Sequence, residues 1–140
     1  MMKKNRTVWS NRFTKGNSKN FQRIGSSINV DKRLYKEDIF ASIVHTKMLI
    51  KQKIIPKKDG LKIIKGLKRI EKEINKNKFK FKEQFEDIHQ NIEKRLFQII
   101  GESAGYLHTA RSRNDQVVTD FKIWVKDSTK NTIGTLDDLI

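Results

Sequence analysis

The amino-acid sequence predicts an all-α protein. Four segments repeat apolar residues every three or four positions, which is the spacing of one helix face. No segment alternates apolar and polar residues like a half-buried strand, and no Asn-Gly pair marks a tight hairpin. With 140 residues, the chain forms one domain at most and can bury one modest core.

The beginning of the chain is polar and is interrupted by Gly16, Asn17 and Asn20. It therefore predicts an extended arm over residues 1–20, with Trp9 and Phe13 as its apolar anchors. The small polar turn Gly25-Ser26-Ser27 follows. It is either an ordinary loop or a loop that closes over an anion.

Two helices are expected next. The first covers residues 31–52, with Asp31 available as its N-cap and Pro56 stopping it. Its apolar positions are Leu34, Tyr35, Phe40, Ile43, Val44 and Met48. The second covers residues 57–75 and has lysines on its solvated face. Its opposite, apolar face consists of Leu61, Ile64, Leu67, Ile70 and Ile74.

The third helix, over residues 84–100, has the most regular stripe: Phe85, Ile88, Ile92, Leu96 and Ile99. Gly101 is placed to end it as the C′ residue. Asp87 lies near the helix start, where a carboxylate stabilises the dipole. His89 is interpreted as a surface or interface group, and His45 as structural.

A fourth helical pattern begins at Val117 and continues to Ile140 without a capping glycine or a polar tail. This open end predicts that the sequence is truncated. It also predicts that the stripe containing Trp124 is exposed in this chain and prone to association.

The formal net charge is +15, from 31 Lys and Arg against 16 Asp and Glu. Residues 1–80 carry 23 basic and 6 acidic side chains, whereas residues 81–140 carry 8 and 10. The excess is mostly lysine and accompanies many Ile and Asn residues, a bias that AT-rich coding produces without selection for a ligand. Aromatic residues are not interleaved with arginines as in a platform that stacks bases. The charge is therefore weak evidence about function.

Absent residue types exclude several kinds of site. Without cysteine there is no disulfide, thiolate nucleophile or cysteine-based zinc site. A secretory signal and an apolar membrane span are also lacking, so the expected location is cytoplasmic. No glycine-rich phosphate loop stands out.

Polar chemistry is concentrated in one segment, His108 to Gln116, just before the last helical pattern. Two arginines with Ser, Thr and Asn side chains at a helix N-terminus suit a carboxylate or phosphate. The alternative is structural: Asn114 or Ser112 caps the helix, and the arginines pair with Asp115 and Asp120. Composition does not decide between them.

This segment, HTARSRNDQ, resembles the first signature region of the argininosuccinate lyase family, within the fumarase/aspartase superfamily. The resemblance runs from Trp9 to about Asp127. It includes Arg12-Phe13, Ser27-Ile28, Asp31, Arg33-Leu34, Glu86-Asp87-Ile88-His89 and Glu93-Lys94-Arg95-Leu96. In one departure, Ser10-Asn11 stand where the family usually has two glycines after the tryptophan.

The resemblance implies a carbon-nitrogen lyase that reversibly cleaves argininosuccinate to L-arginine and fumarate, the last step of arginine biosynthesis, without a metal or organic cofactor. It also implies a homotetramer whose active sites combine three subunits. Residues 21–112 would form an N-terminal helical domain, and residues 113–140 would begin the central bundle of long helices.

The resemblance also assigns residues to substrate binding. Ser27 and Asn114 match positions that bind argininosuccinate, and Ser112 and Arg113 match neighbours that contact its carboxylates. Arg111, Thr109 and His108 would support or line the same loop, whereas Asp87 and His89 match positions of structural character. The family's general base, a Thr-His pair, and its catalytic serine are absent from these residues. The chain alone is therefore expected to be inactive.

Two alternatives remain at this point. A complete protein of this size could be a basic helical module that binds nucleic acid, recognisable by salt-sensitive retention on DNA. It could also be a catalytically inactive relative of the lyases.

Overall fold

The structure, a computed structural model, describes residues 19–140, and in this range every regular element is helical. The all-α prediction is therefore confirmed. The arm predicted for residues 1–20, with Trp9 and Phe13, lies almost entirely outside the described residues. The elements in chain order are α1 (Lys19–Gly25), α2 (Ile28–Asp31), η2 (Lys32–Leu34), α3 (Tyr35–Lys51), α4 (Lys57–Asn75), η3 (Glu83–Phe85), α5 (Ile88–Ile100), η4 (Gly101–His108) and α6 (Arg113–Asp137), where η marks a 3-10 helix.

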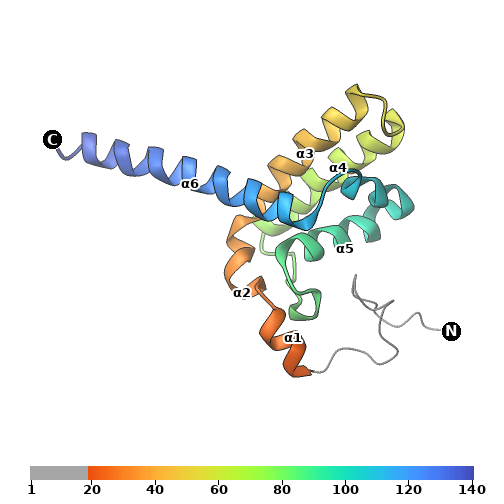
Figure 1. Cartoon of the computed structure of the whole chain (residues 1–140), viewed down its shortest axis with the longest axis horizontal. Helices are drawn as coiled ribbons and strands as arrows, with labels where there is room; N and C mark the ends of the chain where they lie inside the picture. The colour runs from red at the N-terminus through yellow and green to blue at the C-terminus, as the bar shows by residue number, and fades with distance from the viewer. Residues whose placement is uncertain (1–18) are drawn as a thin grey trace.

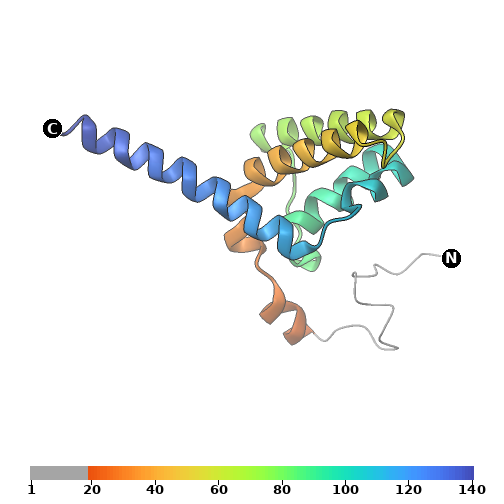
Figure 2. The same ribbon diagram turned by 45° about the horizontal axis from the view of Figure 1, so that its top comes forward.

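The helices α3, α4 and α5, together with η4, form the packed part of the molecule (Figures 1 and 2). Helix α4 lies between α3 and α5 and contributes much of the core. In contrast, α6 packs against α3 only near its start and then projects away from the other helices. The buried core consists of Ile28, Ile39, Ile63, Leu67, Ile70, Ile74, Ile88, Ile92, Leu96 and Leu107.

Helix α3 differs from its prediction in both start and face. It begins at Tyr35, because residues 28–34 form two shorter helical turns, and Asp31 accepts a hydrogen bond from Ser27 Oγ at 2.6 Å instead of capping α3. It ends at Lys51, so Pro56 does not stop it and instead precedes α4. The predicted apolar face is largely exposed: Phe40, Val44 and Met48. The buried face is mainly polar, with Asp38, Ile39, Ser42, Thr46 and Leu49.

Helix α4 begins and ends where the sequence predicts, and most of its predicted apolar face points inward. Ile63, Leu67, Ile70 and Ile74 are buried, whereas Leu61 is exposed. Two buried glycines, Gly60 and Gly66, let α4 approach its neighbours closely. A Cβ atom at position 66 would lie 2.5 Å from Leu96 Cδ1 on α5.

Helix α5 begins at Ile88, four residues after the predicted start, because Glu83–Phe85 form a separate turn. Asp87 is its N-cap and accepts a hydrogen bond from the Gln90 N–H at 2.6 Å. Gly101 ends the helix with φ of 66°, in the left-handed region that favours glycine, as predicted. Ile88, Ile92 and Leu96 of the predicted stripe are fully buried.

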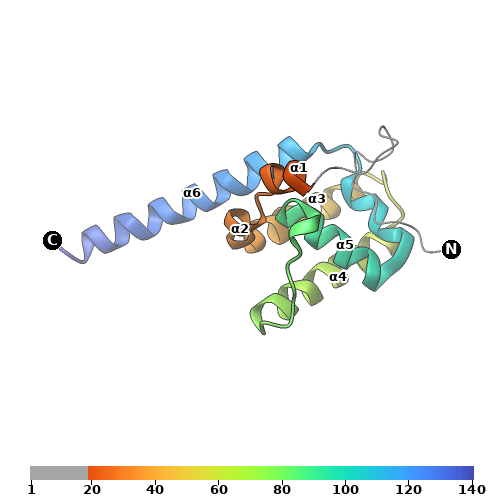
Figure 3. The ribbon, with the colours of Figure 1, turned by 90° about the horizontal axis from the view of Figure 1, so that it is seen from below.

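Helix α6 is the longest element and is mostly exposed beyond its first two turns (Figure 3). The exposed apolar side chains include Val117, Phe121, Trp124 and Val125, which confirms the exposure predicted for the Trp124 stripe. Phe121 and Trp124 stack on each other with ring centroids 6.1 Å apart. No helix among residues 19–140 has both the length and the apolar character needed to cross a bilayer.

Candidate functional site

The segment 108–116 folds as a turn that leads from η4 into α6, and Ser112 caps the long helix. Ser112 Oγ accepts a hydrogen bond from the Asp115 N–H at 3.3 Å, and the Asp115 carboxylate accepts one from the Ser112 N–H at 2.8 Å. This reciprocal capping box satisfies two backbone donors. The structural alternative is thus correct for Ser112, whereas the side chain of Asn114 is exposed.

Arg113 is held by partners that the sequence analysis did not anticipate. Its Nη1 and Nη2 atoms donate to the two carboxylate oxygens of Glu93 at 2.9 and 3.1 Å. Nη1 also donates to Gln116 Oε1 at 2.7 Å, and Nε lies 3.3 Å from Asp87 Oδ2. The prediction that the arginines pair with Asp115 and Asp120 is wrong, because the start of α6 faces the acidic side chains of α5 and its cap.

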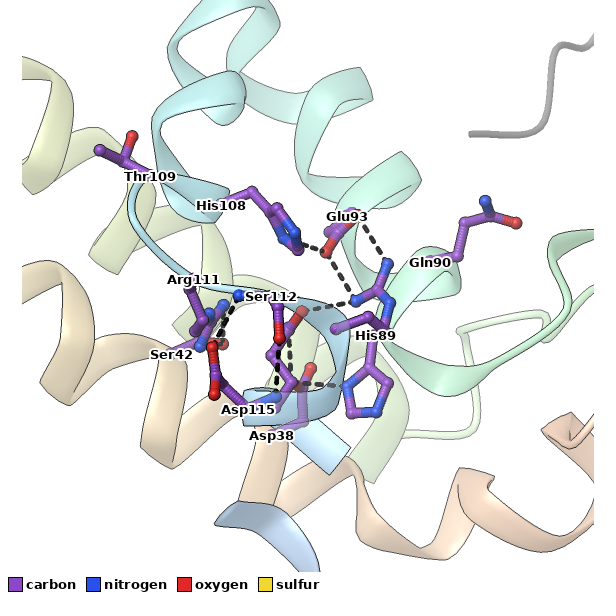
Figure 4. Close-up of polar contacts among 12 residues, drawn as sticks. Asp38, Ser42, His89, Gln90, Glu93, His108, Thr109, Arg111, Ser112 and Asp115 are labelled. Atoms are coloured by element: carbon purple, nitrogen blue, oxygen red, sulfur yellow. Dashed lines mark hydrogen bonds and ion pairs between the residues drawn. The ribbon is translucent and has the colours of Figure 1, made fainter. Parts of the chain in front are cut away.

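Glu93 lies at the centre of this charged group (Figure 4). His108 Nδ1 is 3.6 Å from Glu93 Oε1, so the carboxylate faces the imidazole of His108 as well as the guanidinium of Arg113. Burial would raise its pKa, but His108 and Arg113 outweigh burial and lower the pKa of Glu93 to about 2. Glu93 is therefore ionised at neutral pH and binds the start of α6 to the middle of α5.

Arg111 turns in the opposite direction, towards α3. Its Nη1 and Nη2 atoms both donate to Ser42 Oγ at 3.3 Å (Figure 4). Its Nε atom is buried without a hydrogen-bond partner among the described residues. Burial lowers the pKa of the Arg111 guanidinium, although the Asp38 carboxylate opposes that effect. With no carboxylate in direct contact, Arg111 keeps more of its charge available to an anion than Arg113 does.

Three buried ionisable residues from three helices meet beneath the turn: Asp38 of α3, His89 of α5 and Asp120 of α6. Each is at most 3% exposed. His89 Nδ1 lies 3.0 Å from Asp38 Oδ1 and 3.6 Å from Asp120 Oδ2. Gln116 Nε2 donates to the same Asp38 oxygen at 3.4 Å. The interpretation of His89 as a surface or interface group is wrong: it lies in the interior, where it joins α5 to α3.

Protonation of this cluster is set by burial and by the two carboxylates. Burial, followed by the Asp38 charge, raises the pKa of Asp120 to about 7. Burial would lower the pKa of His89, but the hydrogen bond and charge of Asp38 outweigh it, so the pKa is raised. At neutral pH the cluster therefore retains protons that the separate carboxylates would have lost.

The ligating atoms of Asp38, His89 and Asp120 lie within 4.8 Å of one another, which is close enough to surround a cation. Nδ1 of His89 is the nitrogen nearest both carboxylates, and it already bonds Asp38. A cation would have to break that hydrogen bond, so these three residues form a hydrogen-bonded cluster.

The remaining predicted site residues are distributed around the turn. The Thr109 carbonyl lies 2.9 Å from His45 Nε2, which supports the structural interpretation of His45. Burial lowers the pKa of His45, so the neutral imidazole is favoured. Ser27 precedes α2 and its hydroxyl donates to Asp31; in the part of the chain that the structure describes, Ser27 makes no hydrogen bond to the 108–116 segment.

Ser27 and Arg113 are nevertheless linked through one corner of the chain, Glu86-Asp87. The N–H groups of Ser27 and Ile28 both donate to the Glu86 carbonyl, at 2.9 and 3.1 Å. The next residue, Asp87, pairs with Arg113. Glu86 has φ of 56°, an uncommon conformation for a residue other than glycine, and it directs this carbonyl towards the start of α2. The corner therefore connects the Ser27 turn with the start of α6.

A groove of about 520 Å³ lies between α3 and the first half of α6, next to the turn. Arg111, Asp115 and Gln116 line its polar end. Its other walls are mainly apolar: Phe40, Ala41, Val44, His45, Met48, Ala110, Thr119 and Ile123. The exposed face of α3 that the sequence analysis assigned to the core forms one of these walls.

Sequence reasoning did not single out Glu93, Asp38 or Ser42 as members of the site. It named Gln116 only as the end of the polar segment and Asp120 only as a partner of the arginines. Glu93 and Asp38 are single charges on otherwise ordinary helices, and their partners are 20 or more positions away in the chain. The available signal was indirect: Asp38, Ser42 and Thr46 repeat every four residues, which is the period of a polar inward face.

Comparison with known proteins identifies relatives of the whole chain. A family model described as lyase matches residues 11–140. The chain is 58% identical over 138 residues to an argininosuccinate lyase of Pelagibacter ubique, covering 99% of this chain and 30% of that protein. It is 51% identical over 132 residues to that of Symbiobacterium thermophilum and 48% identical over 132 residues to that of a Sulfurihydrogenibium species, covering 94% of this chain and 29% of each relative.

The chain thus spans about 30% of the length of the curated relatives that it matches. The family match covers nearly all of the chain, including the helices that form the core, the Ser112 turn and α6. On this evidence, the chain belongs to the lyase family.

Proposed function

We propose that this chain supplies part of the substrate-binding site of an argininosuccinate lyase. The observation that carries the proposal is the HTARSRND segment, which forms a capped turn at the N-terminus of α6. Three relatives named argininosuccinate lyase, with 48 to 58% identity, support it. The proposed reaction is the reversible cleavage of argininosuccinate to L-arginine and fumarate.

The chemistry of the reaction suits this turn. A general base removes a proton from the succinyl carbon, a carbanion forms beside a carboxylate, and a general acid assists departure of the guanidinium. The site must hold several carboxylates while negative charge grows on one of them. A helix N-terminus offers unpaired N–H groups and the positive end of the dipole, and Arg111 adds a cation.

The proposed substrate ligands are Ser27, Thr109, Arg111, Ser112, Arg113 and Asn114. Ser27 and Asn114 are exposed, so both side chains are accessible to a substrate. Because the guanidinium of Arg113 is already bonded to Glu93 and Gln116, its direct contribution is assigned to its backbone N–H. Ser112 and Thr109 hold the shape of the turn, since one caps α6 and the other anchors the turn to His45.

The complete enzyme would need groups beyond these 140 residues. We place the general base and the catalytic serine in the remaining part of the protein. We also propose a cytoplasmic homotetramer with shared active sites and no specific nucleic-acid partner. Residues 21–112 would form the N-terminal helical domain, and 113–140 would begin the central helical bundle.

The proposal can be tested by transplanting this chain into a longer relative. The chain replaces the matching 138-residue segment of the Pelagibacter ubique protein. The chimera is then assayed for fumarate formation from argininosuccinate. Activity within about tenfold of the parent, a cost of roughly 1.4 kcal/mol or less, is the expected result.

A pair of variants makes the assay specific for the turn. Asn114→Ala in the chimera should lower kcat/KM at least about a hundredfold, which corresponds to roughly 2.7 kcal/mol of lost transition-state stabilisation. Asn131→Ala, on the exposed part of α6, removes the same type of side chain and should leave kcat/KM unchanged. A folded chimera without activity, or equal losses in the two variants, would contradict the proposal.

A further inference from the structure

A second groove lies away from the Ser112 turn, between the segment that connects α4 to α5 and the outer face of α5 itself. Figure 3 shows this connecting segment, in green, running from the lower end of α4 up to the start of α5. The groove has a volume of about 410 Å³ and shares no lining residue with the turn. Its lining consists of Glu73, Lys78, Phe79, Lys80, Lys82, Phe85, Asn91, Lys94, Arg95 and Gln98.

Five cationic side chains line this groove, against the single carboxylate of Glu73. That carboxylate is already neutralised. Arg95 donates to both of its oxygens at 2.8 and 2.9 Å, and Arg69 donates to it at 3.1 Å. Among the described residues, none of the four groove lysines has a carboxylate within 4.0 Å. Their charges therefore remain available to an anion.

The lysines are presented by a backbone that is fixed at both ends. The Lys78 N–H donates to the Glu73 carbonyl at 2.8 Å. At the other end, Asn91 Oδ1 accepts from the Lys82 N–H at 2.8 Å, while Asn91 Nδ2 donates to the Lys82 carbonyl at 3.2 Å. The buried Asn91 side chain thus bonds both the N–H and the carbonyl of Lys82. Because the backbone of this segment is already ordered, binding of an anion would cost little further conformational entropy.

Phenylalanines and lysines alternate along residues 78–82, with opposite environments. Phe79 and Phe81 pack against the core with ring centroids 4.9 Å apart, whereas Lys78, Lys80 and Lys82 are exposed. Alternation by two positions is the pattern of an extended segment with one buried face. Lys94 and Arg95 face this segment from α5, so cations stand on both walls of one groove. A general excess of lysine in the sequence, without a ligand, would not require cations to gather on both walls of one groove.

We propose that this groove binds a short polyphosphate chain, such as that of a nucleoside triphosphate. Several unpaired ammonium groups around one cavity match a ligand with several adjacent negative charges, because lysine acts on phosphate as a point charge. The volume is within the range of small-molecule sites, and Phe79 and Phe85 supply an apolar wall. This site is independent of the proposed lyase function.

The test is a calorimetric titration of the 140-residue chain with inorganic tripolyphosphate and, separately, with ATP, in about 50 mM salt. Saturable binding at one site is expected for both. Tighter binding of ATP would add a contact to the base, and equal affinities would assign the site to the triphosphate alone; either result supports the proposal. Absence of saturable binding to both ligands overturns it.

Two matched double variants localise the binding. Lys80→Ala with Lys94→Ala removes one cation from each wall, and we expect affinity for tripolyphosphate to fall at least about tenfold. Lys47→Ala with Lys126→Ala removes the same charge from exposed positions outside the groove, and a change below about threefold is expected. Circular dichroism checks that both variants keep the helical content of the parent.

Two results would overturn the proposal that this groove is a polyphosphate site. Equal losses in both double variants would show that tripolyphosphate responds only to the overall positive charge. Binding of single-stranded oligonucleotides that tightens with length and excludes tripolyphosphate would instead identify an extended nucleic-acid surface.

Discussion

Arg113 and Glu93 are joined by two parallel hydrogen bonds, Nη1 to Oε1 at 2.9 Å and Nη2 to Oε2 at 3.1 Å. This pair fixes the first turn of α6 against the middle of α5. An arginine in a carboxylate-binding motif is readily taken as a ligand for substrate. In this chain the guanidinium of Arg113 instead bonds Glu93, and this pair holds the turn in position.

Replacement of Arg113 by lysine should therefore be costly although the charge is kept. An ammonium group cannot bond both oxygens of Glu93 in a fork and also reach Gln116. We expect the free energy of unfolding to fall by roughly 1–3 kcal/mol, measured by urea denaturation. Arg69→Lys is the control, because Arg69 makes one exposed bond to Glu73, and its loss should stay below about 0.5 kcal/mol. Similar losses in both variants would contradict this reading of the pair.

The same carboxylate predicts an acid dependence of stability. The pKa of Glu93 is lowered to about 2 in the folded chain from an ordinary value near 4.5. The folded state therefore binds fewer protons at this group, and the stabilisation is present above pH 4.5 and lost as pH falls towards 2. Its size is roughly 3 kcal/mol. Urea denaturation between pH 6 and pH 2.5 should show this loss, and Glu93→Gln should flatten the curve; an unchanged slope in that variant would assign the loss to other groups.

The raised pKa of Asp120 predicts that the stability of the fold changes with pH in the opposite direction. Its pKa is raised to about 7, so its contribution is fully present below pH 3.8 and lost as pH rises through 7. Asp120→Asn, which mimics the protonated form, should stabilise the chain at pH 8 by roughly 2–4 kcal/mol relative to the parent. At pH 4 the two proteins should differ little. Asp127→Asn on the exposed side of α6 is the control, and a matching gain there would show a general effect of charge.

Gly66 should tolerate no side chain, because its Cβ would lie 2.5 Å from Leu96 Cδ1 and 3.3 Å from Ile100 Cγ2. Gly66→Ala should destabilise the chain by roughly 1–3 kcal/mol through this overpacking. Gly134→Ala, in the exposed part of α6 with nothing within 4 Å of the new Cβ, should stabilise it by about 0.5–1 kcal/mol. Thermal unfolding of the two variants measures both changes in stability. A higher stability of Gly66→Ala would show that α4 and α5 can separate at no cost.

The sequence predicted the helical class, the bounds of α4 and the end of α5 at Gly101, and it offered Ser112 or Asn114 as the cap of α6, of which the structure shows Ser112. These features depend on local signals: periodicity, turn residues and capping chemistry. The assignment of individual residues to substrate contacts remains a prediction.

The sequence did not predict the inward face of α3. Periodicity assigns the apolar side to the core, yet α3 buries Asp38 and Ser42 and exposes Phe40 and Val44. Burial of these polar groups is favourable only because His89 bonds to Asp38 and Arg111 bonds to Ser42, and these partners lie 51 and 69 positions away in the chain. A rule based on neighbouring residues cannot detect partners that only the fold brings together. The same holds for Glu93 and Arg113.

The polar inner face of α3 has a mechanical consequence. Apolar helix faces can slide or rotate slightly while keeping most of their contacts, because the hydrophobic effect is not directional. The hydrogen bonds that Asp38 accepts from His89 and that Ser42 accepts from Arg111 are directional, so turning α3 by one residue, about 100°, would break both. Asp38 also accepts a bond from Gln116 of α6. The angle at which the long helix leaves the other helices is therefore determined by the rotational setting of α3.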